Sequence, residues 1–354
     1  MKVVSPAPRD VWRALATGSE DAVVYQIPEW VDACCSVGGY HDRSRLYETS
    51  DGRRLVLPLV SSSVRSGATV WSLPHKWGQG GILAPDRLTP QDVATVVADI
   101  RRSSVRTIIK PGIVGAEAWK AASARVRRPH AVHVVDLRCG FDHLWLKRLS
   151  GGVRSKVRRA VKAGVTVDWD NTGKHVPVAW DLYLRWAANR GEQQGIPPRI
   201  AVDRAQRLES WVQFHAVAAA LGDRCRVGVA SIDGEPIAFM TMFIHGRYAH
   251  YWRGFSDQTL TRGRYPNQLL LIRLIEEAAK AGCSYVHLGE SGGVRTLEEF
   301  KESLGGEVRS YDELRFEGPV AHTATRLRAR SQPALEALAR ARAHAGELVR
   351  AHSS

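Results

Sequence analysis

Positively charged side chains recur at helical spacing between residues 153 and 163. Arg154, Arg158 and Lys162 are four residues apart, so they project from one face of a helix. The apolar stripe at the same spacing, expected to pack on the protein, consists of Val153, Val157 and Val161. Rows of cations bind nucleic-acid phosphates without reading bases, although like charges at this spacing cost roughly a few tenths of a kcal/mol each. The pattern predicts a phosphate-binding helix, with a solvated helix face as the alternative.

One carboxylate occupies a position suited to proton transfer. Glu290 ends a predicted strand and precedes the Gly292-Gly293 turn, so it is a candidate general base, with a capping or turn role as the alternative. The sequence has no GxSxG nucleophile motif, and His130 and His133, in a predicted strand, lack the spacing of a zinc site. We therefore expect neither a serine nucleophile nor a bound metal.

The residues around Glu290 predict alternating strands and helices. Residues 247–255 alternate in side-chain type as a strand does, and one of its faces should be buried. A helix is predicted after Pro266, and a second strand over 284–288. Thr296 and Glu299 match a capping box that would open a further helix. This order of strand, loop, helix and strand suggests an acyl-transfer scaffold.

A similar order of elements occurs twice in the chain. Residues 45–60 and 226–244 each contain two strand patterns around an Asp-Gly turn. In the first copy, another strand, a helix beginning after Thr89-Pro90 and a strand over 105–110 follow, as their counterparts do in the second copy. The sequence therefore predicts two copies of one mixed α/β unit.

We place the boundary between the two copies near residue 150, because Gly151-Gly152 separates two predicted helices there. The predicted domains are residues 1–150 and 151–318, each of ordinary domain size. Residues 319–354 form a basic tail with helical periodicity. Contact with RNA and packing on the protein body as a solvated amphipathic segment are both open for this tail.

Composition narrows the partners and the compartment. The 354 residues contain 50 Lys and Arg against 36 Asp and Glu, a net charge of +14, which favours a polyanionic partner over a merely basic surface. The five cysteines show no CxxC spacing, so reduced thiols are expected. No stretch approaches the roughly 20 apolar residues of a spanning helix, and the first residues lack a signal-peptide core. We expect a soluble, cytoplasmic protein.

Two segments resemble the Fem-type aminoacyltransferases. Residues 154–165, RSKVRRAVKAGV, are similar to the basic helix and following strand of that family, and residues 300–305, FKESLG, to its F-K-x-x-[FL]-G segment. The resemblance implies a mixed α/β fold of two tandem GNAT-like domains, with the first on the acceptor side and the second on the donor side. No heptad run predicts the coiled-coil arm of some members.

The resemblance also implies a reaction. Aminoacyl-tRNA would be the donor, and the enzyme would need no cofactor besides this co-substrate. The acceptor would be an amine of a peptidoglycan precursor or of a small peptide-like natural product. An aminoacyl ester is already activated, so the amine attacks it directly. Lys301 would stabilise the resulting oxyanion, an effect worth roughly 3 kcal/mol.

Further residues are assigned to the two substrates. Phe300 lies next to the lysine, although its spacing also suits the core. The residues expected on the donor and tRNA side are Phe300, Arg154, Lys156, Arg158, Arg159, Lys162, Arg262 and Arg264. The residues expected on the acceptor side are Lys76, Trp77, Tyr251, Trp252 and Arg253. A structural turn around Lys76 and a core position for one of the strand residues are the alternatives.

Two other functions remain open. An acyl-CoA-dependent N-acyltransferase would suit the scaffold, but residues 257–267 lack the Q/R-x-x-G-x-G/A spacing that cradles the CoA pyrophosphate. Arg262 and Arg264 could still hold a phosphate there. A non-catalytic RNA-binding or membrane-surface protein would explain the charge alone and predicts salt-sensitive binding without turnover.

Overall fold

The computed structural model describes residues 1–64, 69–103, 105–257 and 259–317, so the predicted tail at 319–354 lies outside the described residues. We use first half for residues up to 150 and second half for the rest. The elements of the first half are β1 (Lys2–Val4), α1 (Arg9–Gly18), α2 (Pro28–Gly38), β2 (His41–Asp42), β3 (Arg45–Glu48), β4 (Arg54–Leu57), β5 (Val60–Ser61), β6 (Val70–Trp71), α3 (Pro90–Arg102), β7 (Thr107–Ile109), β8 (Val126–Asp136) and α4 (Gly140–His143).

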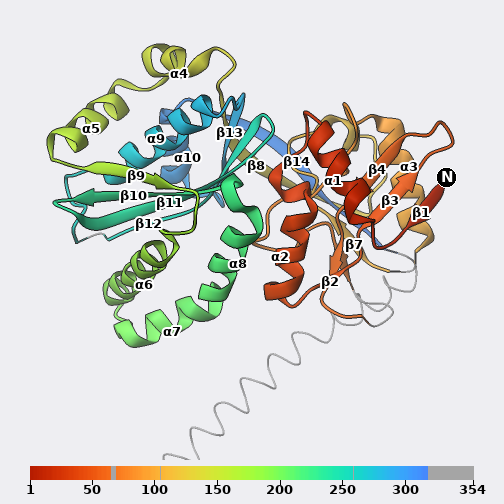
Figure 1. The fold of residues 1–354 in the computed structure, drawn as a ribbon, viewed down its shortest axis with the longest axis horizontal. Helices are drawn as coiled ribbons and strands as arrows, with labels where there is room; N and C mark the ends of the chain where they lie inside the picture. The colour runs from red at the N-terminus through yellow and green to blue at the C-terminus, as the bar shows by residue number, and fades with distance from the viewer. Residues whose placement is uncertain (65–68, 104, 258, 318–354) are drawn as a thin grey trace, which may run out of the picture.

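The second half contains most of the long elements. They are α5 (Gly151–Lys162), β9 (Thr166–Asp170), α6 (Val176–Gln193), α7 (Pro198–Leu208), α8 (Trp211–Leu221), β10 (Cys225–Ile232), β11 (Glu235–His245), β12 (Tyr248–Ser256), α9 (Pro266–Lys280), β13 (Tyr285–Glu290), α10 (Arg295–Ser303) and β14 (Gly306–Phe316). Figure 1 shows α5, α9 and α10 on one face of the sheet in this half and α6, α7 and α8 on the other.

The strands form a small sheet and a large one. The small sheet has the order β1-β3-β4, and the eleven-stranded sheet has the order β2-β5-β6-β7-β14-β8-β13-β12-β11-β10-β9. Two neighbouring pairs of the large sheet are parallel, β6 with β7 and β12 with β13, and each is joined through a helix, α3 or α9. The duplicated unit predicted from the sequence is therefore present as two copies of one strand, helix, strand crossover.

The last strand of each half is exchanged with the other half. β8 ends the first copy but pairs with β13, while β14 ends the second copy but pairs with β7. β8 and β14 also pair with each other over ten positions, which joins both halves in one continuous sheet. The boundary that we propose at residue 150 falls at the N-cap of α5, outside this exchange.

Local sequence explains the turns and caps that the prediction used. Asp233 and Gly234 both have positive φ, 51° and 81°, the backbone that suits a two-residue hairpin turn between twisted strands. Thr89 caps α3 and forms the reciprocal capping box with Asp92. The predicted Asp-Gly turn and the predicted start of a helix after Thr89-Pro90 are confirmed, because each depends only on residues that are close in the chain.

Two details of the prediction are wrong. Thr296 is not a cap, since α10 begins at Arg295 after Val294, which makes no side-chain capping bond. In α5, Val161 is 53% exposed and Ala160 is buried instead. A helix repeats every 3.6 residues, so its buried face moves from a spacing of four to a spacing of three along the helix.

The apolar cores lie on both sides of the large sheet. One core packs α5 and α9 on the second half, and another joins α2 of the first half to α6 and α8 of the second (Figure 1). A third lies under α3. In the described part of the chain, no helix combines the length and apolarity that a membrane crossing needs.

Candidate active site

A cavity opens where two parallel strands separate. β12 and β13 pair only from Tyr248 to His250 and from Tyr285 to His287, although both strands continue further. The gap beyond this pairing forms a cavity of about 260 Å³. Its lining consists of Trp186, Met240, Tyr251, Gly254, Phe255, Ser256, Asn267, Leu271, Leu288, Leu297, Phe300 and Lys301.

Tyr251 and Trp252 of β12 face opposite sides of the sheet, as strand neighbours do, and a β-bulge follows Tyr251. Thr241 pairs with Arg253 and Met242 with Tyr251, which leaves Trp252 as the extra residue. Tyr251 lines the cavity, whereas Trp252 is 8% exposed and belongs to the core shared by both halves. The expectation that one of the three strand residues faces the core is confirmed for Trp252.

Lys301 places a buried cation at this cavity. Its side chain is 5% exposed, and Nζ donates hydrogen bonds to the backbone oxygens of Gly289 and Glu290, both at 2.9 Å. An ammonium has three N–H groups, so one remains for a substrate oxygen. Burial lowers the pKa of Lys301 to about 8, while Glu290 and Glu298 raise it. The ammonium is therefore mainly protonated at neutral pH.

Two further hydroxyl groups line the cavity. Burial raises the pKa of Tyr251 to about 12, so its phenol stays protonated, and we find no hydrogen-bond partner for it among the described residues. Ser256 Oγ accepts from Asn267 Nδ2 at 3.1 Å, which leaves its own O–H to donate. Lys301, Tyr251 and Ser256 together offer three donors to a polar group inside the gap.

Phe300 lies between the core and the cavity. It packs partly buried against the core of the second half and also forms part of the cavity wall, with Leu297, Leu271 and Leu288. Part of the cavity wall is therefore apolar. Contact of Phe300 with a donor stays a prediction.

The Glu290 side chain is turned away from the cavity. Its carboxylate accepts hydrogen bonds from Lys110 Nζ at 2.9 Å and Tyr311 Oη at 2.7 Å, with His130 Nδ1 at 3.2 Å. Burial would raise its pKa, but the bonds from Lys110 and Tyr311 prevail and lower it to about 2. Such a carboxylate is a weak proton acceptor, so the geometry favours a structural role. Sequence reasoning missed Lys110 and Tyr311, because partners about 180 and 20 residues away leave no local pattern.

The row of cations on α5 does not act as one surface. Arg154 Nη1 donates to the backbone oxygens of Trp145 and Leu149 at 3.0 and 2.9 Å, so it closes the preceding helical turn. Arg158 and Lys162 are exposed. The helix instead directs a different pair toward the start of α9.

That pair is Lys156 and Arg159, which lie over the ring of Tyr265, the residue that precedes α9. Lys156 Nζ is 5.8 Å and Arg159 Cζ 4.8 Å from the ring centre. Arg262 and Arg264 are exposed in the adjoining loop. The structure thus gathers four of the predicted donor-side cations near the N-terminus of one helix.

The loop before α9 uses much of its own backbone hydrogen bonding. The Asp257 carboxylate accepts from the amide of Thr259 at 3.0 Å, and the Asp257 carbonyl accepts from the amides of Leu260 and Thr261. The Arg264 amide donates to Thr261 O at 3.0 Å. The amides of Thr259, Leu260, Thr261 and Arg264 are therefore not free to cradle an anion.

Two of the five predicted acceptor-side residues, Lys76 and Arg253, meet around Glu209, which the sequence did not single out. Arg253 Nη2 lies 3.0 Å and Lys76 Nζ 3.8 Å from Glu209 Oε1, although Glu209 is only 8% exposed. Trp77 is buried, with its ring centre 5.7 Å from that of Trp30. An acid at a helix end normally suggests solvent, so no sequence signal marked Glu209.

The equivalent gap in the first half is closed. β6 and β7 pair at only two positions, but Gly80 then donates to Lys110 O and the Lys110 amide donates to Ser72 Oγ, both at 2.9 Å. A Cβ on Gly81 would lie 2.8 Å from Pro111 O, so only glycine permits this approach. Of the two strand gaps, the second half's is the open one.

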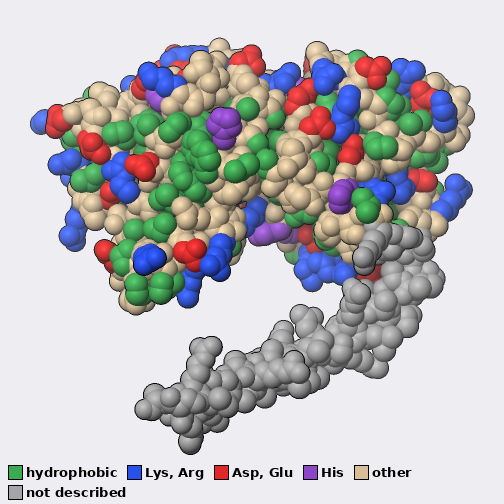
Figure 2. Space-filling model, turned by 60° about the horizontal axis from the view of Figure 1, so that its bottom comes forward, with side chains coloured by type: hydrophobic (Ala, Val, Ile, Leu, Met, Phe, Trp, Pro, Cys, Tyr) green, Lys and Arg blue, Asp and Glu red, His purple; other side chains and the backbone are tan. Residues whose placement is uncertain are grey.

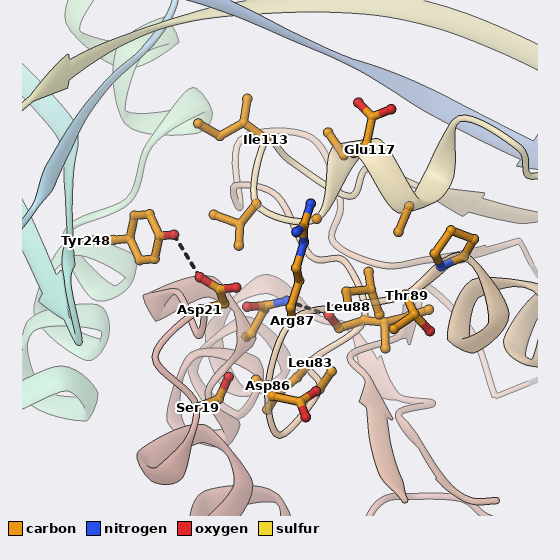
Figure 3. Close-up of a pocket in the computed structure, with 18 of the residues that line it drawn as sticks. Ser19, Asp21, Leu83, Asp86, Arg87, Leu88, Thr89, Ile113, Glu117 and Tyr248 are labelled. Atoms are coloured by element: carbon orange, nitrogen blue, oxygen red, sulfur yellow. Dashed lines mark hydrogen bonds between the residues drawn. The ribbon is translucent and has the colours of Figure 1, made fainter.

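A larger cavity, of about 650 Å³, lies between loops of the first half and the beginning of β12. Figure 3 shows Arg87 extending into it and Tyr248 donating to Asp21 at its wall, a bond of 3.1 Å. The two cavities share no lining residue, so this one is separate from the cavity at Lys301.

Neither the charge on the visible face nor the grouping of metal-ligand side chains marks a further site among the described residues. Figure 2 shows Lys and Arg side chains spread over both halves of the visible face and interleaved with acidic ones. Among the residues described, no three His, Cys, Asp or Glu side chains are grouped so that they could hold a metal ion.

Comparisons with known proteins agree with this architecture. A model of the acetyltransferase (GNAT) domain matches residues 147–302. The crystal structure of FemX is similar with a TM-score of 0.64 and 12% identity, over 89% of this chain and 97% of that one. The C-terminal domain of a putative lysylphosphatidylglycerol synthetase from Agrobacterium fabrum has a TM-score of 0.51 and 14% identity, over 91% and 96%. None of the curated proteins matches the sequence.

The chain therefore has a FemX-like fold of the GNAT type, as the resemblance predicted. The domain match includes the α5 helix, the cavity in the strand gap and Lys301. Together they support a transferase that moves an acyl group.

Proposed function

We propose that this protein transfers an aminoacyl group from aminoacyl-tRNA to an amine, forming an amide bond. The observation that carries the proposal is the Lys301 ammonium, which is buried at the open strand gap with one N–H left for a substrate oxygen. The FemX-like fold supports acyl transfer, and the cations near α9 support a polyanionic donor.

The residues at the gap suit attack of an amine on an ester. The amine nitrogen bonds to the ester carbonyl carbon, and the carbonyl oxygen becomes an oxyanion next to Lys301 and Tyr251. The carbon-to-oxygen bond to the ribose then breaks, the amine gives up a proton, and the ribose oxygen gains one. The neighbouring ribose hydroxyl or a water carries that proton, because Glu290 is held by Lys110 and Tyr311.

The loop before α9 favours tRNA over acyl-CoA as the donor. A CoA pyrophosphate is typically held by free backbone amides at a helix start, whereas several amides here are bonded within the loop. Lys156, Arg159, Arg262 and Arg264 instead offer side-chain charge, the usual contact to a phosphate backbone. The acceptor that the resemblance implies is a peptidoglycan precursor or a small peptide-like natural product in the cytoplasm.

The donor is tested by titrating the purified protein with charged tRNA, uncharged tRNA and acetyl-CoA over a salt series. The test variant is Lys156→Ala/Arg159→Ala, and the matched control is Arg101→Ala/Arg102→Ala, which removes the same charge from exposed positions on α3. We expect tight tRNA binding that weakens with salt and is reduced about tenfold or more in the test variant alone.

Two results would contradict the proposal. Saturable acetyl-CoA binding without a preference for tRNA would support the acyl-CoA-dependent N-acyltransferase instead, a function that the GNAT domain match also allows. Salt-sensitive tRNA binding without transfer to any amine in a broad panel would support the non-catalytic RNA-binding protein.

A further inference from the structure

Four side chains from the two halves meet beside the exchanged strands β8 and β14, which pair with each other. His130 of β8 faces Tyr311 of β14 in the strand register, and their rings stack with centres 5.3 Å apart. Lys110 follows β7 and Glu290 ends β13, the corresponding strands of the two copies. We call Lys110, His130, Glu290 and Tyr311 the junction cluster. Each half supplies two of its members.

The junction cluster saturates one carboxylate. Lys110 Nζ and Tyr311 Oη both bond to Glu290 Oε1, at 2.9 and 2.7 Å, and His130 Nδ1 lies 3.2 Å from Oε2. The Lys110 side chain is 20% exposed and that of Glu290 34%, so the pair is partly shielded from water. Both oxygens of Glu290 are thus anchored to other elements.

The backbone of the same residue holds Lys301. Nζ of Lys301 donates to the carbonyl oxygens of Gly289 and Glu290. Pairing of β13 with β8 is interrupted between His287 and Glu290, and Gly289 has a φ of +73°. The regular ladder therefore does not set the direction of the Gly289 carbonyl. Glu290, the next residue, is fixed twice, because its backbone is in register with Val132 of β8 and its side chain is held by the junction cluster.

We propose that the junction cluster is a positioning network for Lys301, through which the first half sets the place and the charge of the ammonium at the cavity. The proposal rests on the proposed function for its consequence in catalysis. Lys110 and His130 belong to the half expected to bind the acceptor, so they connect that half to the oxyanion site. None of the four touches the reacting atoms, and each acts through the Gly289 and Glu290 carbonyls.

The charges around Lys301 predict opposite effects for two variants. Glu290 and Glu298 favour its protonated form, whereas burial disfavours it. His133, which is 3% exposed and lies 3.9 Å from Glu302, and Tyr251, which lines the same cavity, are further titratable groups close to it. Glu290→Gln removes a negative charge that favours the protonated form of Lys301. Lys110→Met removes the cation that partly neutralises that carboxylate.

The test measures the pKa of Lys301 directly, by NMR of protein labelled at the lysine Cε, with the signal assigned by its loss in Lys301→Arg. We expect Glu290→Gln to lower the pKa and Lys110→Met to raise it, each by about 1 unit, the lower limit for a nearby opposite charge. Lys120→Met is the matched control, an exposed lysine that pairs only with Glu117 on its own turn among the described residues. It should leave the pKa unchanged.

Folding and donor identity are controlled separately. Tyr311→Phe removes the hydroxyl that bonds to Glu290 and to Gln79 but keeps the ring stacked, so it provides a milder variant if Lys110→Met fails to fold. It should also raise the pKa of Lys301, because it frees the carboxylate. The NMR titration needs no substrate, so its outcome is independent of whether tRNA is the donor. Shifts in the same direction, or none in folded variants, would overturn the positioning network.

Discussion

Replacing Lys301 with methionine separates catalysis from folding more sharply than any other change. The side chain keeps its length and apolar stem but loses the ammonium that lines the cavity. Removing one donor to an oxyanion typically costs about 10²- to 10³-fold in turnover. We expect Lys301→Met to reduce the transfer rate by that factor, with little change in donor affinity, since the cations near α9 are untouched.

The expected change in stability is small because two effects oppose each other. The shift in the pKa of Lys301 from 10.5 to about 8 means that folding destabilises its charged form by roughly 3 kcal/mol relative to the neutral form. Methionine relieves that cost but leaves the Gly289 and Glu290 oxygens without this donor, at about 1–3 kcal/mol each. The free energy of unfolding should change by no more than about 3 kcal/mol in either direction.

The assay is single-turnover transfer of a radiolabelled aminoacyl group from tRNA to the best acceptor in a panel of nucleotide-linked muropeptides and free amines. Urea unfolding and tRNA binding are measured on the same preparations. Lys301→Arg is the companion variant, because it retains a cation. A folded Lys301→Met protein that transfers at the wild-type rate would refute the oxyanion role.

Three further predictions follow from the same site. The folded pKa of Lys301, about 8, lies below the unfolded value of 10.5, so the unfolded state binds more protons at pH values between the two. The free energy of unfolding should therefore rise between about pH 8 and pH 10, and this rise should be missing in Lys301→Met. Urea unfolding measured at several pH values would detect the difference. Tyr251→Phe should slow transfer about tenfold through the loss of one hydrogen bond, with donor KM unchanged; a loss confined to KM would contradict its place beside the oxyanion. Gly254→Ala would put a Cβ 2.8 Å from Met240 Cγ and Tyr251 Oη, so we expect about 1–3 kcal/mol of destabilisation by thermal unfolding and a larger relative loss of transfer. Wild-type transfer by this variant would show that the strand gap is not where the ester sits.

Much of the local structure was predictable because its causes are close in the chain. The Asp-Gly hairpin turns, the capping box before α3 and the helix after Pro266 each depend on neighbouring residues. The repeat of these local patterns was enough to predict two copies of one unit. The fold class and the FemX-like architecture were therefore predictable without coordinates.

The candidate site was predictable in its residue types but less so in its geometry. Lys301 and Tyr251 were named, and they line one cavity. Arg154 was assigned to the tRNA side, but it donates to backbone oxygens of the preceding turn. A charged side chain can point either to solvent or to an unpaired carbonyl, and helical spacing does not distinguish the two.

The sequence by itself determined which segments become strands and helices, and where cations and apolar stripes fall on them, because hydrophobic period, caps and turns act over a few residues. Only the tertiary structure decided the exchange of β8 and β14, which brings Lys110 to Glu290 across 180 residues. Only it closed one strand gap and left the other open beside Lys301. Such pairings depend on which strand edges meet in three dimensions, and the separation of two residues along the chain does not predict that.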